Sequence, residues 1–203
     1  MSNAGHSAHG AHDERRRLVI GVVGRAGAGK DELADYLRST HGVRALSIGE
    51  VVRKVAVWRG LPTTRDTLRD ISSTLKEHRG PDVFVRHVIR QIVRQGWPVV
   101  AVSGLRTPED VESFRERFGD SFVLVHVSVD DPSTRFARLK RRGEPRDPES
   151  YEAFERQERA EEEQFDLEET IRLADLTIRN DGAPADFHRR IEEQLVRPFE
   201  IDR

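Results

Sequence analysis

Short apolar runs alternate with longer amphipathic segments along the chain, beginning at residue 18. The runs at 18–23, 98–102 and 122–129 are almost continuous and rich in valine, as expected of strands buried on both faces. Shorter runs at 45–47 and 174–178 complete the set. Because strands alternate with helices, the pattern predicts an α/β fold with a parallel sheet of about five strands and helices on both faces. Ligands of such sheets bind at the carboxyl ends of the strands.

Between the runs, apolar residues recur at the three- or four-residue spacing of amphipathic helices. Leu33, Ala34 and Leu37 form one such stripe, and Thr64 and Pro108 mark the starts of two later helices. We expect a break near residue 165 in the seventh segment. The predicted helices span residues 30–39, 50–58, 65–78, 83–94, 108–118, 131–142, 149–172 and 184–196.

The pattern also divides the chain into a tail and one domain. Residues 1–16 contain Gly, Ala, Ser, His and charged residues without periodicity, which predicts a disordered tail. Residues 17–203 are expected to form a single domain, within which the charged stretch 131–170 is predicted to be a mobile lid insert.

Composition narrows the class of protein. A net charge of −2 argues against a general nucleic-acid binder, and the absence of cysteine excludes disulfides, thiolate catalysis and Cys-type zinc sites. No apolar stretch approaches the roughly 18 residues that a membrane span requires, and no secretory signal is evident. We therefore expect a soluble, cytoplasmic protein that binds neither nucleic acid nor membrane.

The octamer at residues 24–31 directly follows the first predicted strand. It matches seven of the eight positions of the phosphate-binding pattern G-x-x-x-x-G-K-[ST]. Glycines let successive backbone N–H groups face phosphate oxygens, and the next helix adds the positive end of its dipole. We interpret Lys30 as a catalytic group that reaches the β- and γ-phosphates of ATP. The nucleotide-binding loop comprises Gly24, Arg25, Ala26, Gly27, Ala28, Gly29, Lys30 and Asp31.

Asp31 stands where the pattern has a hydroxyl residue. A carboxylate beside a triphosphate is repelled unless a cation lies between them, so we expect Asp31 to bind Mg²⁺, directly or through water. The predicted cofactors are therefore ATP and Mg²⁺.

The segment from Ser47 to Arg53 reads Ser-Ile-Gly-Glu-Val-Val-Arg and follows the second predicted strand. It resembles the Thr-Gly-Asp-x-x-Arg segment of adenylate kinases, and the chain here begins to resemble the nucleoside monophosphate kinases. That resemblance implies that Arg53 binds the phosphate of an acceptor, with Glu50 in the place of the family's Asp. The alternative is a surface ion pair between Glu50 and Arg53.

Ser103-Gly104-Leu105-Arg106 follows the next strand and resembles the Asp-Gly-x-Arg segment of related kinases. It implies that Arg106 is a second ligand of the acceptor phosphate, a role suited to a planar guanidinium. The family's Asp is Ser103 here. Because the carboxylate is instead at Asp31, we expect these two side chains to bind Mg²⁺ with exchanged positions; impaired magnesium binding is the alternative.

Arginines recur in steps of three or four residues from Arg135 to Arg146, so most lie on one helical face. The segment resembles the lid of the same kinases, whose arginines close over the phosphates and neutralise charge during transfer. Arg138 and Arg142 are therefore candidate catalytic residues, together with Lys30 and Arg106. The alternative is a basic surface helix paired with the acidic helix at 149–163.

The stretch from Ala174 to Gly182 resembles the Ala-Asp-x-x-Ile-x-Asn-x-Gly ending of dephospho-CoA kinases and their archaeal relatives, which implies that Asn180 and Gly182 lie near adenine. We therefore expect an ATP-dependent kinase for a phosphorylated small molecule, with a nucleoside or deoxynucleoside monophosphate first. A dephospho-CoA or phosphomevalonate-type acceptor is an alternative. An alternative of another class is a nucleotide-binding regulator or slow ATPase. The sequence fixes neither the acceptor nor the oligomeric state.

Overall fold

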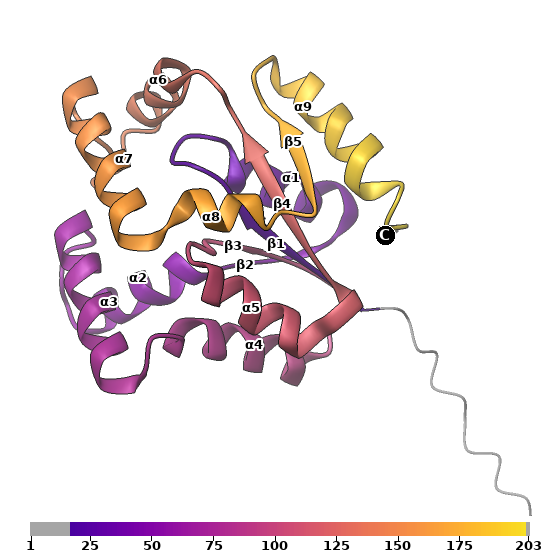
Figure 1. Cartoon of the computed structure of the whole chain (residues 1–203), viewed down its shortest axis with the longest axis horizontal. Coiled ribbons are helices and arrows are strands. Elements are labelled where there is room, and N and C mark those ends of the chain that lie inside the picture. The colour runs from indigo at the N-terminus through magenta and orange to yellow at the C-terminus, as the bar shows by residue number, and fades with distance from the viewer. Residues whose placement is uncertain (1–16, 202–203) are drawn as a thin grey trace, which may run out of the picture.

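Five parallel strands form a single sheet at the centre of the fold (Figure 1). The structure is a computed structural model that describes residues 17–201, so the predicted tail lies outside the described residues. The predicted α/β class is confirmed, with the strand order β2-β3-β1-β4-β5. The strands are β1 (Leu18–Val23), β2 (Arg44–Ser47), β3 (Val99–Ser103), β4 (Phe122–Ser128) and β5 (Leu176–Arg179).

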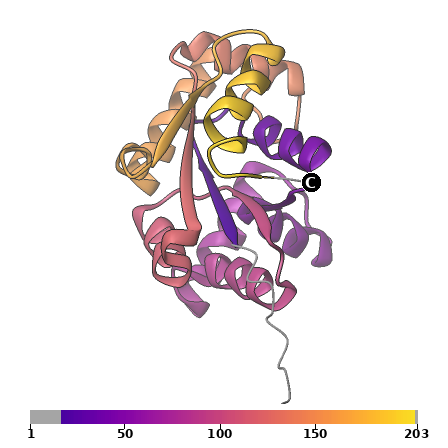
Figure 2. The same ribbon diagram turned by 90° about the vertical axis from the view of Figure 1, so that its right-hand side faces the viewer.

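Helices cover both faces of the sheet, as the alternating pattern predicts. Helices α1 and α9 pack on one face, and α2, α4, α5 and α8 on the other (Figures 1 and 2). The α6 and α7 helices lie beyond the carboxyl end of β4. The helices are α1 (Lys30–His41), α2 (Ile48–Trp58), α3 (Arg65–Arg79), α4 (Val83–Gln95), α5 (Pro108–Phe118), α6 (Pro132–Arg142), α7 (Tyr151–Phe165), α8 (Leu167–Arg172) and α9 (Pro184–Ile191).

The break expected near residue 165 is confirmed. The segment at 149–172 forms two helices, α7 and α8, because Asp166 adopts a left-handed conformation with φ 50° and ends the first of them. One boundary differs from the sequence pattern. The last predicted helix ends at Ile191 and continues as a π-helical segment, Glu192–Val196. Short 3₁₀ geometry at Gly119–Ser121 leads into β4.

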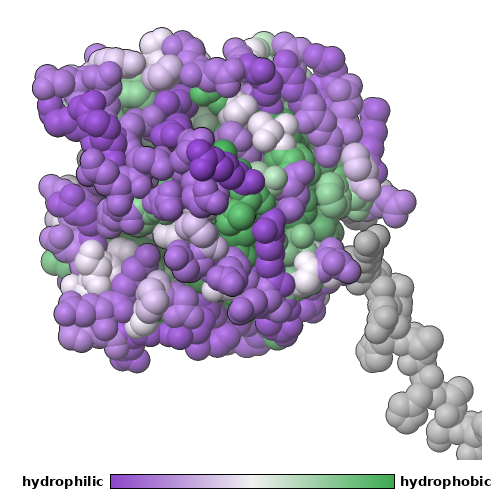
Figure 3. Space-filling view, in the orientation of Figure 1, coloured by the Kyte–Doolittle hydropathy of each residue, from purple (hydrophilic) through white to green (hydrophobic). Residues whose placement is uncertain are grey.

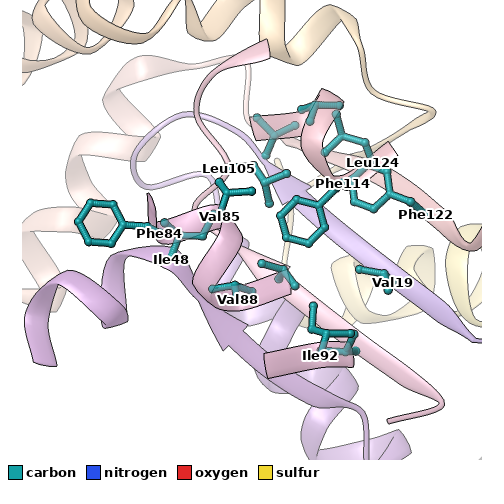
Figure 4. Close-up of a cluster of buried hydrophobic side chains, with 14 of the residues drawn as sticks. Val19, Ile48, Phe84, Val85, Val88, Ile92, Leu105, Phe114, Phe122 and Leu124 are labelled. Atoms are coloured by element: carbon teal, nitrogen blue, oxygen red, sulfur yellow. The ribbon is translucent and has the colours of Figure 1, made fainter. Parts of the chain in front are cut away.

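Alternation along β1 divides the core into two layers. Ile20 and Val22 pack toward α1 and α9, whereas Val19 and Val23 pack toward α2, α4 and α5. In the second layer, the rings of Phe114 and Phe122 stack with centroids 5.4 Å apart (Figure 4). These layers fix the strand ends that carry the polar loops.

The face seen in Figure 3 is mainly hydrophilic, and its apolar side chains gather over β4 and β5. Among residues 17–201, no helix combines the length and apolar character needed to cross a bilayer.

Replacing Phe114 with alanine tests this core. The side chain is fully buried, so Phe114→Ala is expected to lower the free energy of unfolding by about 3–5 kcal/mol through lost transfer energy and a cavity. Phe199→Ala removes a ring that is 38% exposed and is expected to cost no more than about 1 kcal/mol. Urea unfolding of both variants makes the comparison, and equal losses would contradict the assigned core.

Candidate active site

The loop between β1 and α1 is pressed against two other segments of the chain. Gly27 has φ 76° and Gly29 has φ 103°, conformations that favour glycine. A Cβ on Gly27 would lie 2.5 Å from the Arg135 carbonyl oxygen, and one on Gly29 would lie 2.3 Å from Asn180 Nδ2. Both glycines are therefore required by backbone conformation and by close approach.

Asn180 fixes this loop from the end of β5. Its buried side-chain amide donates a hydrogen bond of 2.8 Å to the Ala28 carbonyl, and its backbone N–H donates one of 2.8 Å to the Ser128 carbonyl. A buried amide with a matched acceptor stabilises the loop conformation. The structure thus gives Asn180 a bracing contact, while the expected proximity of Asn180 and Gly182 to adenine stays a prediction.

Lys30 is half-buried and bonded to the loop that precedes it. Its ammonium donates to the carbonyls of Gly24, at 2.6 Å, and Arg25, at 2.9 Å. Burial lowers the pKa of Lys30 to about 8, because removal from water disfavours the charged form; Glu161 and Asp31 partly oppose this shift. The amine is therefore charged at neutral pH, and it borders the cavity described next.

A cavity of about 660 Å³ opens over the loop and the carboxyl ends of the strands. It brings together thirteen of the residues that the sequence singles out, whereas Arg25, Ala28 and Glu50 do not border it. Five of these thirteen are lysine or arginine, so the cavity is rich in cations. Those that border it are Gly24, Ala26, Gly27, Gly29, Lys30, Asp31, Arg53, Ser103, Arg106, Arg138, Arg142, Asn180 and Gly182.

Asp31 and Ser103 supply two oxygen donors to this cavity. The Asp31 carboxylate is largely exposed and lies 3.6 Å from Arg142 Nη1, and Ser103 is buried at the end of β3. Among the described residues no three His, Cys, Asp or Glu side chains gather as a metal cluster. Mg²⁺ commonly takes one or two protein oxygens and completes its shell with phosphate and water, so the donor set fits the predicted ion.

A second cavity of about 420 Å³ adjoins the first between α2, α3 and α7. Arg53 and Arg106 border both cavities. Arg53 also pairs with Glu50 at 2.7 Å, so the ion pair given as the structural alternative is present. The Arg106 guanidinium lies 5.1 Å from the ring centroid of Phe165. Arg53 and Arg106, which are predicted to bind one phosphate, therefore lie where the two cavities meet.

The basic helix α6 pairs with the acidic helix α7 and also supplies arginines to the first cavity. Arg135 is buried and pairs with Glu158 of α7 at 2.6 Å, as the alternative of a basic helix paired with an acidic one expects. Arg138 borders the cavity; one of its nitrogens donates to the Asn180 carbonyl at 2.7 Å, and Nη1 is buried with no hydrogen-bond partner in residues 17–201. Arg142 pairs with Asp147 at 2.5 Å. Arg138 thus reaches the cavity from α6 and keeps one buried nitrogen without a hydrogen-bond partner among the described residues.

Sequence reasoning missed Glu161 on α7 and Arg65 on α3. Their side chains form an ion pair, and Glu161 also lies 3.9 Å from Arg106 Nη1. Burial alone would raise the pKa of Glu161, but the cations Arg106, Arg65 and Lys30 lower it below its usual range. In the sequence Glu161 is one of three consecutive glutamates. Only the rotation of α7 about its axis, which turns Glu161 toward the cavity, distinguishes it from its two neighbours.

Similar proteins show to which family the chain belongs. A family model described as an AAA domain matches residues 20–166. A UPF0200 protein of Pyrococcus horikoshii is 32% identical over 179 residues, which cover 87% of this chain and 95% of that protein.

Two solved kinases are similar in fold. A gluconokinase from Sinorhizobium meliloti 1021 has a TM-score of 0.57 and 15% identity, covering 92% of this chain and 96% of that one. A shikimate kinase from Acinetobacter baumannii in complex with shikimate has a TM-score of 0.54 and 19% identity, covering 91% and 96%. At these identities the likeness shows the fold alone, which is that of P-loop NTPases of the kinase type.

Nucleotide affinity is expected to fall as pH rises, because Lys30 loses its charge above a pKa of about 8. Between pH 7 and pH 9 the affinity for Mg·ADP should drop by about tenfold, in proportion to the protonated fraction. Isothermal titration calorimetry measures this drop. Lys30→Arg keeps its charge over the range, so the affinity of this variant, whatever its size, should not change with pH. A pH-independent wild type would contradict the assigned role of Lys30.

Proposed function

The chain belongs to an AAA domain family of P-loop NTPases and to the UPF0200 proteins, and we propose that it is an ATP-dependent small-molecule kinase. The observation that carries the proposal is the pair of adjoining cavities, one over the loop with Lys30 and one beyond Arg53 and Arg106. A kinase needs a donor site and an acceptor site that share a border, since phosphoryl transfer depends mainly on positioning and charge stabilisation.

In this proposal ATP·Mg²⁺ occupies the first cavity. The loop at residues 24–31 binds its phosphates, and Asp31 and Ser103 would hold the ion, which when bound would neutralise phosphate charge. Lys30, Arg138 and Arg142 stabilise the negative charge of the transferring group. The cationic lining of the first cavity supports these roles.

The acceptor in this proposal is a phosphorylated small molecule in the second cavity. Arg53 and Arg106 bind its phosphate, whose oxygen is already a nucleophile and needs no strong base. A nucleoside or deoxynucleoside monophosphate is the first candidate, because of the resemblance to nucleoside monophosphate kinases; dephospho-CoA and phosphomevalonate-type acceptors follow. A cytoplasmic location, without nucleic-acid or membrane partners, belongs to the same proposal.

One observation favours a second candidate, a nucleotide-binding regulator or slow ATPase. Asp31 replaces the hydroxyl of the loop, and it lies within ion-pair distance of Arg142. A carboxylate held by an arginine would bind Mg²⁺ less well, and turnover would then be slow even with tight nucleotide binding.

Conversion of ATP to ADP with Mg²⁺, measured against nucleoside and deoxynucleoside monophosphates, dephospho-CoA and phosphomevalonate, separates the two candidates. The kinase proposal expects at least one compound to stimulate ADP formation, with phosphate recovered on that compound. Lys30→Ala should abolish the stimulated rate. Tight ATP binding without any stimulated turnover would overturn the kinase and favour the regulator.

The predicted metal site is tested by Asp31→Asn. Loss of the charged oxygen should weaken Mg²⁺-dependent ATP turnover by about tenfold or more, whereas nucleotide binding in the presence of EDTA should change little. Asp35→Asn, which alters an exposed carboxylate of the same helix that does not border the cavity, serves as the matched control. Equal losses of turnover and metal-free binding in Asp31→Asn would show that Asp31 does not act through the ion.

A further inference from the structure

We propose that Arg65 is a third ligand of the acceptor's anionic group, and that the Glu161 carboxylate occupies the position of that group when no acceptor is bound. The inference rests on the proposed kinase function and deepens it, because it assigns the anion-binding residues at the junction of the two cavities. It also states that acceptor binding is an exchange of one anion for another.

The first support is the composition of the junction. Nine described residues border both cavities, and among them Glu161 is the one acidic side chain. Four of the other eight are arginines, so an anion at this point is surrounded by guanidinium groups. The nine are Gly49, Arg53, Arg65, Gly104, Arg106, Arg146, Gln157, Glu161 and Phe165.

The second support is how Glu161 is held. Its side chain is only 16% exposed; it pairs with Arg65 and has Arg106 at 3.9 Å. A largely buried charge persists only when charged or hydrogen-bonded partners compensate for the loss of water. Arg106 is already predicted to bind the acceptor phosphate. Arg65 pairs with the same Glu161 carboxylate, so both guanidinium groups lie beside the position where that phosphate would bind.

The third support is the way α7 presents its carboxylates. Glu158, Glu161 and Glu162 follow the spacing of one helical face, and each pairs with a cation from another segment. The partners of the outer two are Arg135 on α6, at 2.6 Å, and Arg25 in the phosphate-binding loop, at 3.5 Å. The acidic face of α7 thus neutralises the cations around the phosphate site.

An acceptor phosphate is a better ligand for this junction than a carboxylate. It carries up to two negative charges and accepts bidentate hydrogen bonds from several arginines at once. Its entry would place it between Arg53, Arg65 and Arg106 and would displace the Glu161 side chain from Arg65. Without an acceptor, Glu161 fills the junction and offsets part of its positive charge, which limits access of water to the donor phosphate.

The test is the affinity for inorganic phosphate of protein saturated with Mg·ADP, measured by calorimetry. Glu161→Gln keeps the shape of the side chain and removes the competing charge, so phosphate should bind about three- to tenfold more tightly than to the wild type. Glu163→Gln, on the exposed face of the same helix, should bind phosphate as the wild type does.

Arg65→Ala completes a double-mutant cycle with Glu161→Gln. Alone it should weaken phosphate binding, and in the Glu161→Gln background it should abolish the increase in phosphate affinity. A wild type that does not bind Mg·ADP would overturn the proposed function itself, which this titration detects first. If Mg·ADP binds but Glu161→Gln leaves phosphate affinity unchanged or lower, or if Arg65→Ala has no effect, the inference is wrong.

Discussion

The site depends on the hydrogen bonds that hold the half-buried ammonium group of Lys30. A charge without water must be satisfied by the protein, and here the carbonyls of Gly24 and Arg25 accept its hydrogen bonds. Those carbonyls point at the amine only because the loop takes conformations that glycine permits, with Asn180 bracing Ala28 from β5. Under the proposed function, a phosphate group would offer Lys30 a charged partner in place of two neutral ones.

The same principle extends to the arginines around the carboxyl end of the sheet. Cations gathered in one cavity repel one another unless anions lie among them, and α7 supplies these as Glu158, Glu161 and Glu162. Of these, Glu161 borders the cavity, whereas Glu158 and Glu162 pair with Arg135 and Arg25 beside it. Under the proposed function, a substrate phosphate replaces a carboxylate as the partner of the same guanidinium groups. Its affinity then depends on how much more strongly those groups bind phosphate than carboxylate.

Local pattern was enough to predict the strands, the helices of the two layers and the loop at 24–31, because burial and backbone conformation leave direct traces in valine runs and glycine spacing. Pattern could not predict the strand order or the bracing role of Asn180, since both depend on contacts between distant segments. Arg65 and Glu161 were missed for the same reason. One is among many surface-type arginines and the other is among three adjacent glutamates, so only the orientation of α3 and α7 in space distinguishes them.

The most direct test of the central claim is a crystal structure of the protein with Mg²⁺ and a non-hydrolysable ATP analogue. The account predicts that the β- and γ-phosphates contact the loop at residues 24–31, and that Lys30 Nζ has left the carbonyls of Gly24 and Arg25 to bind them. A nucleotide bound elsewhere, or one bound over this loop with Lys30 still on both carbonyls, would contradict the account.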